Sequence, residues 1–294
     1  MEEKWWCQSL FEILLHEHSL YALFKLHWLI LILAIVYFYV KNVIRSPLYN
    51  VTAWQKTYFF TAVFLGFLIK CTPLDVLGSH YFFSVHVFQM AFAYFVIIPL
   101  LILSLPVNFL RKYIWGHRTK FALNILAHPW LTLVTFNGLL TLYLIPSIFN
   151  LVHMNVVVVY IVQVVIFFSA IFMWWVIIHP VPEIKGFGHL MRALYIFLAS
   201  VALFPIGFFY VIIQNEFFPM YVETAGTFIP AFTAVYDQQA AGGILKIIQL
   251  ASYAVALLVI LFKWGKIEED REGTIDDENI RYVRGVVVHL DKKK

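Results

Sequence analysis

Two short stretches of this sequence place imidazole and thioether side chains close together. His86 and Met90 are four residues apart, so on a helix they share one face, and His153 is followed directly by Met154. Imidazole nitrogen and thioether sulfur form a soft ligand set that suits Cu(I) better than zinc, magnesium or calcium. The sequence therefore predicts a copper site with ligands from His86, Met90, His153 and Met154.

Other polar side chains near these pairs extend the prediction. His80 and His27 are expected as further metal ligands, and Gln89, beside Met90, as a group that orients them. A second interpretation stays open for each residue taken alone. A histidine in a helix bundle can instead hydrogen-bond a neighbouring helix, and Met90 can fill a gap between side chains.

Asp237 and Gln238 form a separate polar pair near the end of the chain. They stand where an acidic connection meets the last apolar stretch, so they could attract the cation or orient a ligand histidine. Asp237 also lies four residues before Ala241 and could cap a helix that begins there. Both interpretations remain open from the sequence.

The composition shows what kind of element must position these residues. Of 294 residues, 62% are apolar and only 13% are charged, which leaves too little polar surface for a water-soluble domain. The stretch from Tyr81 to Leu105 has no Lys, Arg, Asp or Glu and is long enough to cross the ~30 Å hydrocarbon core as a helix. The chain is predicted to be an integral membrane protein surrounded by lipid, and its net charge of +4 argues against a nucleic-acid partner.

Seven such spans are predicted, so the expected fold class is an all-α integral membrane protein. The spans cover about residues 20–40, 57–69, 81–105, 121–145, 153–178, 190–213 and 241–262. Pro129 should kink the fourth span. Residues 1–19 are expected to form an interfacial segment, 20–264 the seven-helix membrane domain and 265–294 a hydrophilic tail, with a strand-like stretch from Tyr282 to Leu290.

The charges of the connections predict the orientation in the membrane. Basic residues concentrate after spans one, three and five, whereas the connection 214–239 carries three acids and no base. By the positive-inside rule the N-terminus is outside and the C-terminus, with the tail, is cytoplasmic. All the predicted metal ligands then lie at or near the outer face. Cys7 and Cys71 also fall on that side, and no disulfide between them is expected.

Three stretches, in this order, resemble the CtaG-type assembly factors for bacterial cytochrome c oxidase. They are the third span with His80, His86, Gln89, Pro99 and Pro106, the end of the fifth with Met173-Trp174-Trp175, Pro180 and Pro182, and Asp237-Gln238-Gln239-Ala-Ala-Gly242-Gly243. The similarity in layout extends through residue 264. It implies a multi-pass protein of the bacterial cell membrane, not an enzyme, that helps copper reach the catalytic subunit of the oxidase. That subunit and other copper chaperones are the expected partners.

The sequence departs from the family pattern at three places. In many members the third span resembles the motif His-x-x-Gln-His. In this sequence Met90 stands where the second histidine of that motif would be. The fourth span closes on Tyr143-Leu-Ile-Pro146 without a histidine, and Gln163 occupies a position of the fifth span where another is expected. Since a Met-for-His change keeps a Cu(I) ligand, two or three soft ligands are predicted to hold the ion transiently and exchange it rapidly.

Two other functions stay open from the residues. An intramembrane metal-dependent hydrolase needs about three ligands around an activated water, and no span carries a His-x-x-x-His pair. A transporter or receptor-like protein would be favoured by charges deep in the spans. Lys25 and Lys246 are both expected near span ends, so neither of them favours this function.

Overall fold

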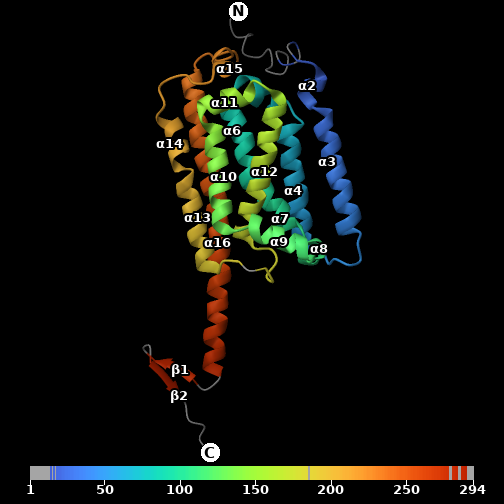
Figure 1. Ribbon diagram of the computed structural model, residues 1–294, viewed down its shortest axis with the longest axis vertical. Coiled ribbons are helices and arrows are strands. Elements are labelled where there is room, and N and C mark those ends of the chain that lie inside the picture. Colours follow the sequence, from blue (N-terminus) through green and yellow to red (C-terminus); the bar gives the residue numbers. More distant parts are fainter. Residues whose placement is uncertain are drawn as a thin grey trace, which may run out of the picture.

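The computed structural model describes residues 14, 16, 18–184, 186–277, 280–283 and 286–289. Long helices stand side by side as a bundle, and α16 continues beyond it as a single rod (Figure 1). We call the end of the bundle with α11 (Pro146–His153) and α15 (Pro219–Val222) the upper end. The end with α8 (Val107–Ile114) and α9 (His117–Leu126) is the lower end. The predicted interfacial segment 1–19 lies mostly outside the described residues.

Among the described residues, five helical segments are long and apolar enough to cross a membrane, or up to seven if each of two bent pairs counts as one span. The membrane-spanning, largely helical fold is thus confirmed, with five to seven spans. The remaining elements, in chain order, are α2 (Leu20–Phe24), α3 (Leu26–Tyr39), η2 (Val40–Ile44), α4 (Ala53–Lys70), α5 (Leu74–Val76), η3 (Leu77–Tyr81), α6 (Phe83–Phe92), η4 (Ala93–Ile97), α7 (Ile98–Ser104), α10 (Pro129–Leu144), α12 (Val156–Ile178), α13 (His189–Ala202), α14 (Phe204–Ile212), α16 (Ala234–Asp277), β1 (Ile280–Val283) and β2 (Val286–His289).

The kink predicted at Pro129 is confirmed. Helices α9 and α10 meet at a 60° bend, because His128 takes an extended conformation before the proline and Pro129 starts the new helix. A second pair, α4 with α5 and η3, bends by 60° after Lys70. Both bends shorten the straight part of a span and leave a short helical arm at one end of the bundle.

A buried ion-pair cluster attaches the first span to the bundle. Lys25 separates α2 from α3 in a left-handed conformation, with φ 37°, and its ammonium group binds the Asp75 carboxylate. Lys70 Nζ lies 2.9 Å from the other oxygen of Asp75, which is buried. Since a buried carboxylate is stable only when it is paired, these contacts hold α2, α4 and α5 together.

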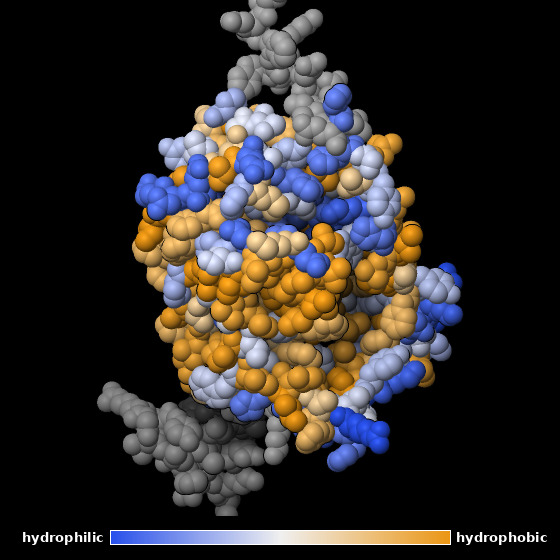
Figure 2. All heavy atoms as spheres, turned by 45° about the horizontal axis from the view of Figure 1, so that its top comes forward, coloured by the Kyte–Doolittle hydropathy of each residue, from blue (hydrophilic) through white to orange (hydrophobic). Residues whose placement is uncertain are grey.

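Apolar side chains face outward as well as inward. The largest buried cluster includes Phe95, Phe136, Trp174 and Tyr253 from four different helices. In Figure 2, apolar side chains cover the middle of the visible face, and hydrophilic ones gather toward the upper end. Such an exposed apolar band is what a helix bundle presents to lipid.

Helix α16 differs from its predicted bounds at both ends. It begins seven residues before the predicted span and runs unbroken through the expected boundary at residue 265 to Asp277. At 1.5 Å per residue its 44 residues exceed the ~30 Å hydrocarbon core, so it extends well past the membrane. Beyond it, β1 and β2 form an antiparallel hairpin that overlaps the stretch predicted to be strand-like and begins two residues before it, at Ile280.

The early start of α16 corrects the predicted place of Lys246. This residue lies inside the helix instead of at a span end, and its ammonium group reaches Ser200 O at 3.3 Å, near the middle of the sixth span. A stronger bond, at 2.6 Å, goes to Gln249 Oε1. These two acceptors bind the ammonium group of Lys246 within the bundle.

Gly242 allows α16 to approach α14 closely, which leads to a first prediction. A Cβ at Gly242 would lie 2.7 Å from Gly207 O, whereas one at Gly243 would meet nothing within 4 Å. We expect Gly242→Ala to lower the free energy of unfolding by about 1–3 kcal/mol, since a backbone oxygen cannot move alone. Gly243→Ala, the matched control, should leave stability unchanged or slightly raised. Thermal unfolding in detergent compares the two, and equal midpoints would contradict this packing.

Candidate functional site

Two histidines from different helices meet at the upper end of the bundle. His86, in the first turns of α6, and His153, the last residue of α11, have ring centroids 5.6 Å apart and an interplanar angle of 73°. The hydroxyl of Tyr143 lies 2.9 Å from His86 Nε2. Phe149 stacks on the His153 ring at 3.8 Å and meets the His86 ring edge-on. We call His86 and His153 the imidazole pair.

The hydrogen bonds of His153 determine which of its nitrogens is available. Its Nδ1 lies 2.8 Å from the carbonyl oxygen of Phe149, and because a carbonyl only accepts, Nδ1 carries the proton. Nε2 then keeps its lone pair. Burial lowers the pKa of His153 below the usual imidazole value, and the bond to Phe149 opposes this only in part. His153 is therefore a neutral imidazole with one free ligand nitrogen.

Asp237 holds the helix turn that carries His86. Its carboxylate accepts hydrogen bonds from the backbone N–H of Phe83 at 2.6 Å and of Ser84 at 3.0 Å. Since the N-cap residue Phe82 has no side-chain cap, a residue of α16 caps α6 instead. The structure thus shows Asp237 as a helix cap, although not of the helix predicted to begin at Ala241, and its predicted role beside a metal stays a prediction. The capped helix is α6. Asp237 cannot cap the start of α16, since α16 has already begun at Ala234.

The two glutamines also bind backbone groups. Gln89 Nε2 donates to Leu74 O at 2.6 Å and ties α6 to α5. Gln238 accepts from the N–H of Phe217 at 3.2 Å and donates to Ala234 O at 2.9 Å. A Cβ at Gly78 would come within 3.0 Å of the Gln89 amide, so glycine is needed where η3 passes α6. These residues support the frame around the imidazole pair.

The other predicted ligands lie in different surroundings. Met90 is buried in the main core on the same helix as His86, whereas Met154 is 81% exposed. The ring of His80 lies 5.4 Å from that of His18. His27 has Tyr21 Oη 3.2 Å from its Nδ1. In the described part of the chain, no group of three or more His, Cys, Asp or Glu side chains is placed to hold a metal ion.

Sequence reasoning missed the aromatic partners of the imidazole pair. Tyr143 lies near the end of an apolar helix. A buried hydroxyl there needs a hydrogen-bond partner, and this need was the signal that the sequence offered. The side chain of Gln163 lies near that of Tyr143. Two positions at which the sequence departs from the family pattern, Tyr143-Leu-Ile-Pro146 and Gln163, thus lie close to His86 or to its hydrogen-bond partner. Phe149 gave no comparable signal, because an apolar ring is ordinary in a core.

Cys71 is buried and has no disulfide partner among the residues that the structure describes. Cys7 lies outside the described residues, so the expected absence of a disulfide between them stays a prediction.

A comparison with protein families matches residues 35–266 to the cytochrome c oxidase caa3 assembly factors (Caa3_CtaG). The chain belongs to this family. The match includes α6, α11 and α16 as far as residue 266, which build the imidazole pair and its support, and it confirms the resemblance found in the sequence. Membership of this family gives the protein a role in the assembly of cytochrome c oxidase. A search of curated proteins and a search of solved structures gave no match.

The cap of α6 can be tested directly. Asp237→Ala removes the acceptor of two buried N–H groups, so we expect the free energy of unfolding to fall by about 1–3 kcal/mol. Amide hydrogen exchange should quicken at the start of α6. Glu216→Ala, which removes an exposed acid, is the control. Unchanged exchange at Phe83 and Ser84 in the Asp237 variant would show that the cap is dispensable.

The lowered pKa of His153 predicts a pH dependence of stability. Below about pH 6.5 the unfolded chain protonates this imidazole while the folded protein does not, so the free energy of unfolding falls as the pH falls. His153→Gln should remove this contribution and flatten the change in unfolding midpoint between pH 7.5 and pH 5.5. An equal slope in wild type and variant would mean that His153 titrates alike in both states.

Proposed function

We propose that this assembly factor handles copper, with Cu(I) as a cargo held transiently by His86 and His153. The observation that carries the proposal is the imidazole pair itself, in which the buried ring of His86 from α6 meets the partly buried ring of His153 from α11. Buried polar groups in a membrane bundle are costly and are usually functional. The family role gives copper a destination, because the catalytic subunit of cytochrome c oxidase contains copper.

The geometry of the pair suits one bridging ion. With a metal–nitrogen bond of about 2 Å, two imidazoles on the same ion have ring centroids about 6 Å apart. The observed separation is 5.6 Å. His153 Nε2 has a free lone pair, and His86 can turn a nitrogen to the ion by exchanging its bond with Tyr143. Met90, one turn further along α6, is a third ligand of the right softness.

A small number of ligands favours transfer over storage. Four well-placed ligands form a closed site, whereas two or three leave positions at which an acceptor can bind the ion. Met154 is exposed and directly follows His153, so its sulfur is suited to receive the ion or pass it on. We therefore infer a handover and not a catalysed reaction. The acceptor is the oxidase catalytic subunit, and other copper chaperones are the donors.

The charge distribution supports an outward-facing upper end in the bacterial cell membrane. The lower end carries Arg111, Lys112, Arg118 and Lys120 on α8 and α9. The connection between α14 and α16, at the upper end, has acids and no base. By the positive-inside rule the lower end is cytoplasmic, which gives the imidazole pair access to copper from outside.

A hydrolase is the less favoured alternative. It needs a third ligand and a general acid or base around an activated water. The described residues offer two imidazoles packed between Phe149 and Tyr143. This surrounding suits a soft ion that needs no water ligand better than it suits hydrolysis.

Copper binding by the purified protein tests the proposal. Under anaerobic conditions a Cu(I)-specific chromophoric chelator competes with wild type, with His86→Leu/His153→Leu, and with His117→Leu as the control from the exposed lower end. We expect wild type and the control to withdraw one copper ion, and the double variant to bind at least tenfold more weakly. Unfolding midpoints and membrane abundance must match, since loss of structure also removes binding.

Oxidase activity in cells separates copper handling from the family role. The double variant should lose activity when copper is limiting and regain part of it when copper is added, because mass action offsets weak binding. Full activity of the double variant at limiting copper would end the copper proposal and leave the assembly role intact. Unchanged oxidase activity in cells that lack the whole chain would instead contradict the assembly role.

A further inference from the structure

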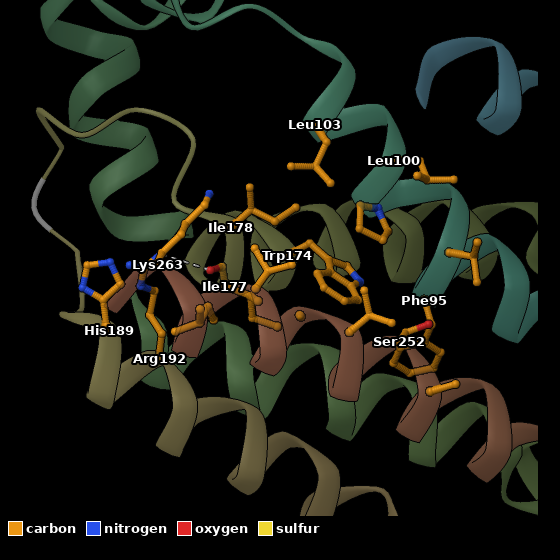
Figure 3. Close-up of a pocket in the computed structure, with 17 residues that line it drawn as sticks. Phe95, Leu100, Leu103, Trp174, Ile177, Ile178, His189, Arg192, Ser252 and Lys263 are labelled. Carbon is orange, nitrogen blue, oxygen red and sulfur yellow. Dashed lines mark hydrogen bonds between the residues drawn. The ribbon is translucent and has the colours of Figure 1, made fainter. Parts of the chain in front are cut away.

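A cavity of about 350 Å³ lies in the lower half of the bundle, between η4 and α7 on one side and α12, α13 and α16 on the other. Figure 3 shows its lining, with Phe95 and Trp174 toward one end and His189, Arg192 and Lys263 gathered at the other. The lining between these ends is apolar. None of its lining residues belongs to the imidazole pair or is one of the residues that support the pair.

The cavity opens to the side of the bundle. Its inner wall is formed by buried residues, among them Phe95, Trp174 and Ile177. Its rim includes Leu103, which is 40% exposed, and Val255, which is 63% exposed. An opening bordered by exposed apolar side chains in a membrane protein faces acyl chains and not water.

One end of the cavity carries unbalanced positive charge. Arg192 and Lys263 line it, and no Asp or Glu does. Arg192 donates a long bond of 3.5 Å to Ile177 O, while its Nε is buried and has no hydrogen-bond partner within the described residues. Helix α13 begins at His189 without a side-chain cap, so its positive end adds to the same field. A buried guanidinium nitrogen without an acceptor indicates a missing anionic group.

We propose that this cavity binds an anionic phospholipid specifically. The phosphate is recognised by Arg192 and Lys263, and one acyl chain lies along Leu103, Trp174 and Val255. A free phosphate would leave the apolar length of the cavity unfilled. A zwitterionic lipid would bring a headgroup cation to an end that has three basic side chains and no acid. The site is independent of the copper proposal, because it uses none of the same residues.

Lipid retention by the delipidated protein tests this inference. Native mass spectrometry would follow palmitoyl-oleoyl phosphatidylglycerol, the matching phosphatidylcholine and inorganic phosphate, each added to wild type. We expect one phosphatidylglycerol to be retained, phosphatidylcholine at least tenfold more weakly, and no displacement of the lipid by excess phosphate. Equal retention of both lipids would overturn the anionic recognition. Displacement by phosphate would show an anion site without a lipid chain.

Two kinds of variant separate the headgroup contacts from the chain contacts. Arg192→Gln/Lys263→Gln should weaken phosphatidylglycerol binding at least tenfold, and Val255→Phe should weaken it by filling the cavity without a change in charge. Lys41→Gln/Lys120→Gln removes two exposed charges at the same end of the bundle, away from the cavity, and should bind like wild type. Unaltered binding in the first two variants, or an equal loss in the control, would contradict the site.

Discussion

The upper end of this protein depends on one carboxylate. Asp237 accepts hydrogen bonds from two N–H groups at the start of α6, which lie 154 and 153 residues earlier in the chain, so the third and last spans are joined by a charge-assisted cap. In an apolar surrounding, uncapped N–H groups are costly, and α6 supplies no cap of its own. The position of His86 relative to His153 therefore depends on how α16 packs. Gly242 permits that packing by letting α16 lie against α14.

The same need to satisfy polar groups explains why the upper end is well defined. Asp75 is paired with two lysines, Gln89 binds Leu74 O, and Tyr143 binds His86. Each bond links different elements. The imidazole pair thus lies in a region whose backbone is fixed from several sides, which keeps the two rings in place.

The two ends of the bundle have different chemistry. The upper end offers imidazole nitrogen and thioether sulfur, the ligand types that would suit the soft cation of the copper proposal. The lower end offers guanidinium and ammonium groups beside an apolar cavity, the combination on which the lipid proposal rests. An assembly factor for a membrane oxidase needs both a route for its cargo and a stable place in the lipid around its partner. In this chain the two tasks would fall to separate residues, so each can be altered without the other.

The spans, one bend and the family of this protein follow from the sequence alone. Uninterrupted apolar stretches predict the spans because the bilayer fixes their length, Pro129 predicts the bend because it cannot donate a helix hydrogen bond, and the order of short motifs indicates the family. Tertiary structure decided what depends on contacts between distant residues. It brought His86 to His153 and exposed Met154, it moved the Asp237 cap from its own helix to α6, and it put Arg192 beside Lys263. Local patterns reveal which residues can act and which element carries them. Which of them meet is decided by helix packing, where shape and the satisfaction of buried polar groups act across the whole chain.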